Sequence, residues 1–325
     1  MLVCTLGDPH SVNVELLGKI FKKSMGSQSN DPVVLVGSYG QWAYQCERLG
    51  LSDLPKFTEV DSLKEAEESP GFYFLNTGGT AQDPRGLSQL ELGKIAKASL
   101  DVLSGFSPTR KLAVLTCPID KLACSKAGFP FTGQTEYFEH IWQGNAVMVL
   151  AGKDLKVGLA TNHLPLADVS AHLSSELIYE KIQKFGSTLK DNFGIERPRI
   201  AVCGLNPHCG EGGLVGHEEF ELIRPAIKSV SSLPQLTVEG PLPADTVFWQ
   251  TLQGHYDGVL AMYHDQGLGP LKTVHFDSAI NISGGLKHLR VSPDHGPAKD
   301  LIFENRASSR SFEIAWETCM QYLKG

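Results

Sequence analysis

Three histidines occupy equivalent places in the chain, because His163, His208 and His264 each follow a short apolar segment by a few residues. Loops at the carboxyl ends of neighbouring strands can converge on one point. Neutral imidazole is a common ligand of zinc and similar ions, and three protein ligands leave coordination positions open for a substrate. One such histidine would more often cap or hydrogen-bond locally. Three of them favour a metal site.

The segment 262–273, MYHDQGLGPLKT, collects an imidazole, a carboxylate, an amide and an ammonium within twelve residues: His264, Asp265, Gln266 and Lys272. It follows an apolar run typical of a buried parallel strand, and its glycines allow the backbone to come close to a bound molecule. We interpret His264 as a metal ligand and Lys272 as an anion contact. The alternative is a polar turn with a helix-capping aspartate.

A third group of polar residues follows downstream, where Lys272 is succeeded by Asn281, Ser283 and Arg290. Two cations and an amide suit a phosphate or a carboxylate, through point-charge and bidentate contacts. The segment 281–285, NISGG, is typical of a binding loop, although any one of these charges could simply face solvent.

Asp245 follows a rigid proline turn, GPLPADT, near the expected start of a helix. It could be the N-terminal cap of that helix or a carboxylate directed at the site. On the residues alone, capping is the better interpretation.

Composition narrows the class of protein. The chain has 325 residues, 42% of them hydrophobic and 20% charged, with a formal net charge of -7. That charge argues against nucleic acid or an anionic membrane as the main partner. The N-terminus lacks the pattern of a signal peptide, and no apolar run is long enough to span a membrane. The seven cysteines are scattered and form no CxxC, which favours reduced thiols in a cytoplasm.

Strands and helices alternate along the chain, and one hairpin is expected around 152–154. This order predicts an α/β fold with a mixed sheet. No G-x-G-x-x-G occurs, so a Rossmann dinucleotide site is not supported. The expected strands are 2–6, 33–36, 72–75, 112–115, 146–150, 155–160, 200–204 and 258–262. The expected helices are 12–23, 41–49, 87–103, 133–142, 169–189, 218–229, 243–252 and 311–323, and 52–70 is expected to be a surface connection.

With these residues in view, the chain resembles the 4-hydroxythreonine-4-phosphate dehydrogenase family of the vitamin B6 pathway. The similarity covers most of the chain. Its most specific segments are 204–219 (GLNPHCGEGGLVGHEE), 240–246 (GPLPADT), 257–273 (DGVLAMYHDQGLGPLKT) and 276–300, with shorter matches at 116–121 (TCPIDK) and 160–166 (ATNHLPL).

The resemblance implies an isocitrate/isopropylmalate dehydrogenase-like fold, with two lobes and an active-site cleft between them. It implies one catalytic unit over 1–325, with lobe one at about 1–115 plus 265–325. Lobe two, at about 116–264, would carry the dimerisation surface and the metal site. It also implies a homodimer whose active site lies at the subunit interface.

The resemblance places the metal ligands on His163, His208 and His264. It places substrate contacts on Thr135, Lys272, Asn281 and Arg290, and on Gln134, where the family has a histidine. Glutamine cannot carry a proton charge near neutral pH, so substrate preference could differ. A second departure lies at 7–13, where the family's Gly-Asp-Pro-Ala-Gly-Ile-Gly reads GDPHSVN.

The implied reaction is oxidation of 4-phosphooxy-L-threonine by NAD or NADP with a divalent metal, zinc, cobalt or magnesium. The 3-oxo acid formed would decarboxylate to 3-amino-2-oxopropyl phosphate, in pyridoxal phosphate biosynthesis. Asp245 is the candidate base and Lys272 the second catalytic residue, while no cofactor-binding residue is assigned. Alternatives are a same-family dehydrogenase of another phosphorylated four-carbon hydroxy acid (phosphoerythronate or phosphothreonate type), a non-catalytic phosphometabolite-binding protein, and a metal-dependent hydrolase.

Overall fold

The computed structural model describes residues 1–24, 30–230 and 235–324. The chain divides into two compact units, 1–144 plus 287–325 and 145–286, called unit 1 and unit 2 below. The resemblance led us to expect boundaries near 115 and 264. In the structure, residues 116–144 belong with unit 1 and residues 265–286 with unit 2.

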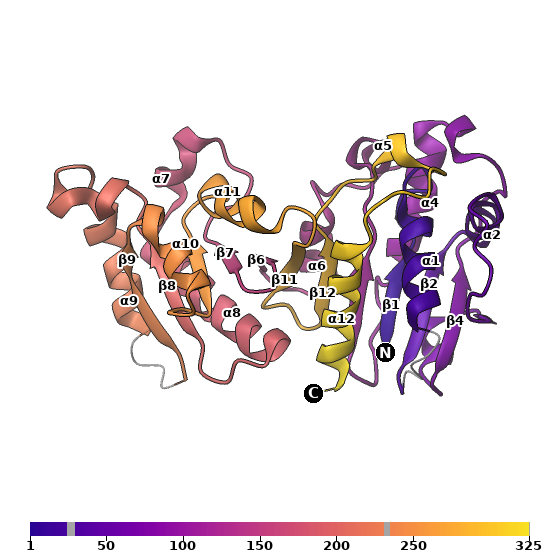
Figure 1. The fold of residues 1–325 in the computed structure, drawn as a ribbon, viewed down its shortest axis with the longest axis horizontal. Coiled ribbons are helices and arrows are strands. Elements are labelled where there is room, and N and C mark those ends of the chain that lie inside the picture. The colour runs from indigo at the N-terminus through magenta and orange to yellow at the C-terminus, as the bar shows by residue number, and fades with distance from the viewer. Residues whose placement is uncertain (25–29, 231–234, 325) are drawn as a thin grey trace. The chain divides into compact units, whose positions relative to one another are not determined.

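Unit 1 is built on a wholly parallel sheet in the order β3-β4-β2-β1-β5-β12 (Figure 1). Its strands are β1 (Leu2–Thr5), β2 (Pro32–Gly37), β3 (Thr58–Val60), β4 (Gly71–Asn76), β5 (Ala113–Thr116) and β12 (Leu289–Pro293). Its helices are α1 (Asn13–Ser24), α2 (Tyr39–Arg48), α3 (Leu63–Ala66), α4 (Gln89–Asp101), α5 (Lys121–Lys126), α6 (Gln134–Ile141) and α12 (Arg310–Lys324).

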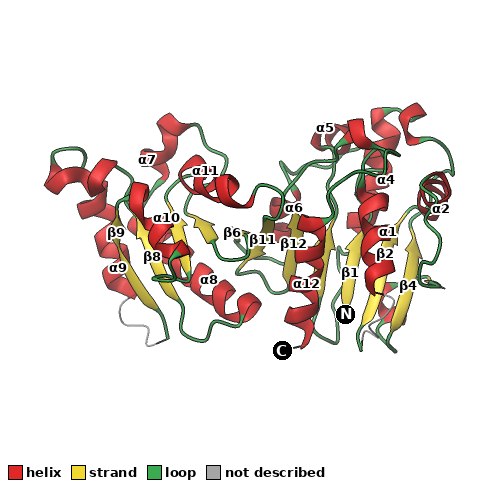
Figure 2. Cartoon of the chain, in the orientation of Figure 1, coloured by secondary structure: helices red, strands yellow, loops and turns green. Residues whose placement is uncertain are grey.

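Unit 2 is built on a mixed sheet in the order β11-β6-β7-β10-β8-β9. Its strands are β6 (Val147–Ala151), β7 (Lys156–Leu159), β8 (Arg199–Cys203), β9 (Thr237–Leu242), β10 (Gly258–Ala261) and β11 (Ile280–Gly284). Its helices are α7 (Val169–His172), α8 (Ser175–Phe193), α9 (Arg224–Val230), α10 (Ala244–Leu252) and α11 (His264–His275). The pairs β6–β7 and β6–β11 are antiparallel, and β7, β10, β8 and β9 run parallel (Figure 2).

The core of unit 2 follows from the alternation of side chains along its strands, which sends successive residues to opposite faces. On one face, Phe185 of α8 fills the space above Gly158 and Gly258. On the other face, strand residues such as Val157 and Val259 form one buried cluster with side chains of α10 and α11. The sheet is therefore covered on both faces, and its carboxyl edge is left for polar loops.

Most expected elements are confirmed to within a few residues, and the expected mixed sheet and hairpin are both present. The long helix expected at 169–189 is wrong in one respect, because the chain breaks between α7 and α8. Ser174 caps α8, its hydroxyl accepting a hydrogen bond from Leu177 N at 3.1 Å. The segment 52–70 was expected to be a connection, yet it contains β3 and α3.

The polar turn considered for 262–273 is helical from His264 onward, as α11. The segment 281–285 was expected to be a binding loop, but its residues up to Gly284 belong to β11. In the described ranges, no helix is both long and apolar enough to cross a membrane.

Candidate functional site

The three histidine-bearing loops are joined by hydrogen bonds around Met262. The side chain of Gln266 accepts a hydrogen bond from Met262 N and donates one to the Gly204 carbonyl, both at 2.7 Å. The Thr161 hydroxyl donates to the Met262 carbonyl at 2.7 Å. Thr161 precedes His163, Gly204 precedes His208 and Met262 precedes His264, so these bonds fix the starting points of all three loops.

Two of the three predicted metal ligands lie side by side. The ring centroids of His163 and His264 are 5.4 Å apart. His163 is exposed and His264 is half-buried as the first residue of α11. The Nδ1 atom of His264 lies 2.7 Å from Asp265 Oδ1, so the carboxylate orients the imidazole and leaves its Nε2 for another partner.

His208 lies in a turn whose backbone is left-handed. The φ angles are 50° at His208, 55° at Cys209 and 44° at Glu211, and the intervening glycines share this region. A non-glycine residue in that region costs about 1–2 kcal/mol. Strain of this kind is concentrated at functional sites, because the surrounding structure must hold it in place. The strain is a reason, independent of the sequence pattern, to treat this loop as functional.

Two neighbouring carboxylates, one buried and one half-buried, hold the strained loop. Glu219 is fully buried and accepts hydrogen bonds from Asn206 N at 2.7 Å and Asn206 Nδ2 at 3.0 Å. Glu218 accepts from the same amide nitrogen at 2.8 Å and from the Ser170 hydroxyl at 2.7 Å. These hydrogen bonds lower the pKa of Glu218 to about 2, and the bond from Ser170 has the largest effect. Both carboxylates thus fix Asn206, two residues before His208.

The described part of a single chain contains no group of three or more His, Cys, Asp or Glu side chains arranged to hold a metal ion. The rings of His163 and His264 lie close to each other, as two ligands of one ion must, while His208 is exposed on its own turn. The three-histidine site therefore stays a prediction.

The remaining predicted residues of unit 2 lie on three different elements. Lys272 is half-buried on α11, with its Nζ 5.6 Å from the centre of the Phe276 ring. Asn281 lies on β11, and its Oδ1 is buried and accepts no hydrogen bond. Asp245 is exposed in the first turn of α10, whose N-cap residue is Pro243. No side chain caps that helix, so the capping interpretation of Asp245 is wrong.

Gln134, Thr135 and Arg290 belong to unit 1. Arg290 is buried, with 3% exposure, and its Nε donates to the Thr116 hydroxyl at 3.0 Å. Burial lowers the pKa of Arg290 to about 10, against a raising effect of Glu136. Gln134 and Thr135 begin α6, and Gln134 Nε2 donates to the Cys117 carbonyl at 3.0 Å. Its Oε1 is buried and accepts no hydrogen bond.

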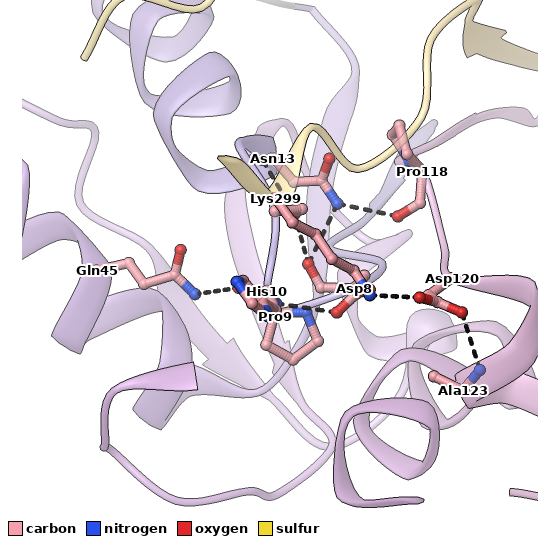
Figure 3. Close-up of polar contacts among 10 residues, drawn as sticks. Asp8, Pro9, His10, Asn13, Gln45, Pro118, Asp120, Ala123 and Lys299 are labelled. Atoms are coloured by element: carbon pink, nitrogen blue, oxygen red, sulfur yellow. Dashed lines mark hydrogen bonds and ion pairs between the residues drawn. The ribbon is translucent and has the colours of Figure 1, made fainter. Parts of the chain in front are cut away.

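The residue types alone gave no sign of a charged cluster at the carboxyl edge of the unit 1 sheet (Figure 3). Lys299 forms an ion pair with Asp120 and lies 3.7 Å from Asp8 Oδ2. Asp8 is 1% exposed, and burial raises its pKa to about 6. The neighbouring His10 has a lowered pKa, mainly through burial. The loops after β1 and β5 and the segment after β12 are thus joined by one lysine.

The altered segment 7–13 has its own set of hydrogen bonds. Asn13 Nδ2 donates to the carbonyls of Leu6 at 2.9 Å and Pro118 at 3.0 Å. The Ser11 hydroxyl donates to the Asp8 carbonyl at 2.5 Å. Side chains therefore fill the places where the resembled family has glycines. The sequence signal that could have revealed this cluster is the polar residues at these positions, together with the aspartate at 120.

Comparison with known proteins first defines the class. The fold is shared with isocitrate dehydrogenase from Methylococcus capsulatus, at a TM-score of 0.51 and 10% identity over 99% of this chain and 85% of that one. A family model described as pyridoxal phosphate biosynthetic protein PdxA matches residues 32–319, and the chain belongs to this family.

Relatives within that class are similar over nearly their whole length. The 4-hydroxythreonine-4-phosphate dehydrogenase of Stutzerimonas stutzeri is 37% identical over 98% of this chain and 96% of its own. That of Pseudoalteromonas translucida is 36% identical, covering 97% and 94%. A crystal structure of 4-hydroxythreonine-4-phosphate dehydrogenase from Klebsiella pneumoniae superposes with a TM-score of 0.80 at 34% identity, covering 100% and 98%.

We predict that Gln266→Leu destabilises unit 2 and releases the loop that carries His208. The substitution removes both side-chain bonds and leaves Met262 N and the Gly204 carbonyl unpaired, at a cost of about 1–3 kcal/mol each. Urea unfolding measures the change in the free energy of unfolding. Gln253→Leu, at an exposed position on α10's C-cap, is the matched control. Equal stability of the two variants would contradict the role of Gln266.

A second prediction concerns the pH dependence of stability. Because the folded-state pKa of Asp8 is raised from 3.8 to about 6, its stabilising effect is complete below pH 3.8 and is lost as pH rises through 6. The loss is on the order of 3 kcal/mol. Asp8→Asn removes this dependence, so the variant should be more stable than the parent at pH 8 and differ least near pH 4. Thermal unfolding across this range, with the exposed Asp61→Asn as control, measures it.

Proposed function

We propose that the protein is a metal-dependent NAD or NADP dehydrogenase that oxidises 4-phosphooxy-L-threonine in pyridoxal phosphate biosynthesis. The observation that carries the proposal is the similarity over nearly the full length to relatives named 4-hydroxythreonine-4-phosphate dehydrogenase. The 3-oxo acid formed would lose carbon dioxide and give 3-amino-2-oxopropyl phosphate. The seven free cysteines agree with a reducing cytoplasm.

The basic residues fit a substrate with anionic groups. Arg290 is a buried guanidinium whose pKa is lowered by burial, and an anion bound beside it would offset the cost of burying the charge. Lys272 supplies a second cation from α11. The buried Oδ1 of Asn281 accepts no hydrogen bond, so a hydroxyl or ammonium group of the substrate would supply the missing donor. Gln134 and Thr135 would contact the substrate from α6.

The donor set also fits a divalent metal such as zinc, cobalt or magnesium, zinc and cobalt being better matched to imidazole. The observation in favour is the closeness of the His163 and His264 rings and the orientation of His264 by Asp265. His163, His264 and, from its strained turn, His208 would hold the ion. The ion, when bound, would lower the pKa of the substrate hydroxyl.

Asp245 is the base that this proposal assigns. It is an exposed carboxylate in the first turn of α10, and it forms no cap hydrogen bond there. Its oxygens would therefore accept the proton of the substrate hydroxyl, and a nicotinamide cofactor, when bound, would supply the hydride acceptor. Lys272 would hold an anionic group of the substrate during this step.

A homodimer with the active site at the subunit interface is part of the proposal. Large apolar side chains are exposed in the segments of unit 2 that follow predicted site residues in the sequence. Leu166 follows His163 and is 71% exposed, Leu214 follows His208 and is 86% exposed, and Trp249 follows Asp245 and is 63% exposed. Exposed apolar side chains of this kind are typical of association surfaces.

We predict that His264→Ala lowers the amount of bound metal and lowers kcat/KM by more than about 100-fold. Loss of a residue that only supports a metal ligand typically costs up to about 100-fold, so loss of a ligand should cost more. Metal content by mass spectrometry and the formation of reduced nicotinamide are the two readouts. His255→Ala, at an exposed histidine, is the control. Unchanged metal content and turnover in the His264 variant would exclude the metal assignment.

Gln134 motivates one alternative substrate, a phosphorylated four-carbon sugar acid of the phosphoerythronate or phosphothreonate type. If Gln134 sets the preference, Gln134→His should shift the ratio of kcat/KM toward 4-phosphooxy-L-threonine by about tenfold. The measurement is reduced nicotinamide formation over a panel of phosphorylated hydroxy acids. Phosphate release without NAD would instead indicate a hydrolase, and inactivity with every substrate and added metal would indicate a binding protein.

A further inference from the structure

The C-terminal end of α11 is fastened to the hairpin turn between β6 and β7. His275, the last residue of α11, places its Nε2 2.5 Å from Asp154 Oδ1 in that turn. Its Nδ1 lies 3.5 Å from the Ser278 hydroxyl. The imidazole is buried, with 10% exposure, whereas the Asp154 side chain is 57% exposed. The contact thus joins an inward-facing ring to a carboxylate at the surface.

The turn is shaped to receive this ring. A Cβ atom at Gly152 would lie 2.2 Å from His275 Cδ2 and 2.3 Å from its Cγ. No real Cβ approaches a ring so closely, so the ring occupies space that only glycine leaves open. Gly152 N also donates to the Leu155 carbonyl at 2.8 Å, which closes the turn beside the ring.

His275 also connects α11 to β11. Its carbonyl accepts hydrogen bonds from Ser278 N at 3.3 Å and Ala279 N at 3.1 Å, which turn the chain into the strand. Asn281 then pairs with Leu150 of β6, the strand that leads into the same hairpin. Lys272 lies one helical turn before His275, on the same element. The hairpin, the helix and β11 are therefore fixed to one another at this residue.

We propose that His275 and Asp154 form a positioning pair that sets where α11 presents Lys272 to an anionic group of the ligand. The pair acts through the helix and does not itself touch the ligand. The role of Lys272 rests on the proposed function, while the pair itself does not. Loss of the pair should weaken ligand binding far more than it slows the chemical step.

The existence of the pair is tested without any assay of activity. Proton NMR of the full-length protein should show a downfield imidazole N–H resonance that moves upfield or disappears in Asp154→Asn, whose amide oxygen is a weaker acceptor, and that stays unchanged in His255→Gln, an exposed histidine. Absence of that resonance from the parent protein, or an unchanged position of it in Asp154→Asn, would overturn the pair.

Its positioning role is tested by binding and kinetics on the same variants. His275→Gln and Asp154→Asn should each raise the Kd for inorganic phosphate and the KM for the phosphorylated substrate about five- to tenfold, with kcat changed less than about twofold. Gly152→Ala, which displaces the His275 ring but keeps both partners, should raise Kd and KM in the same way. His255→Gln should match the parent in both quantities. Unchanged Kd and KM in the first two variants would overturn the role.

Failure of the proposed function gives a different pattern. In that case the parent protein forms no reduced nicotinamide with any substrate, yet the resonance and the phosphate affinity still report on the pair. A loss of phosphate affinity in Asp154→Asn then supports positioning of Lys272. Where the parent protein is active, a fall in kcat with unchanged KM would contradict positioning, because the pair would then affect the reaction and not the binding.

Discussion

The candidate metal loops of unit 2 depend on a single backbone position, Met262. Its N–H and carbonyl lie just beyond the end of β10, and the carbonyl accepts a backbone hydrogen bond from Thr161 N at 3.2 Å. The Gln266 side chain accepts a hydrogen bond from the Met262 N–H, and the Thr161 hydroxyl donates one to the Met262 carbonyl. Gln266 also donates a hydrogen bond to the Gly204 carbonyl. Unpaired buried backbone groups are costly, so the same bonds that satisfy β10 also fix the neighbouring loops. These hydrogen bonds are sufficient for the three histidine-bearing loops to start from the same edge of the unit 2 sheet.

This constraint explains why strain can be placed at His208. A left-handed turn of non-glycine residues persists only where its surroundings hold it, and here the turn begins from a strand end fixed by Gln266 and continues past Asn206, fixed by Glu219. A fully buried carboxylate with two hydrogen bonds from one residue is a rigid support. The histidine is therefore presented on a stiff loop even though its own side chain is exposed.

The alternation of apolar runs was enough to predict the α/β class, the central hairpin and most strands. The prediction from apolar runs missed α11, where local helix propensity and tertiary packing disagree. α11 contains Pro270 and two glycines, which argue against a helix, yet Gly267 is needed because a Cβ there would come within 2.7 Å of Val157. Among the site residues, the histidines were found by their place after strands. The pairing of Asp8 with Lys299, nearly three hundred positions away, has no local signal.

The altered segment 7–13 lies beside Asp120 and Lys299 in this same cluster of unit 1. Ser11 and Asn13 satisfy carbonyls around Asp8, and Asp120 gives Lys299 a second carboxylate. The Asp8 carboxyl group accepts a hydrogen bond from His10 N at 2.9 Å and lies 3.7 Å from Lys299 Nζ. Ser11 and Asn13 thus replace the backbone freedom of the family's two glycines with side-chain hydrogen bonds at this strand edge.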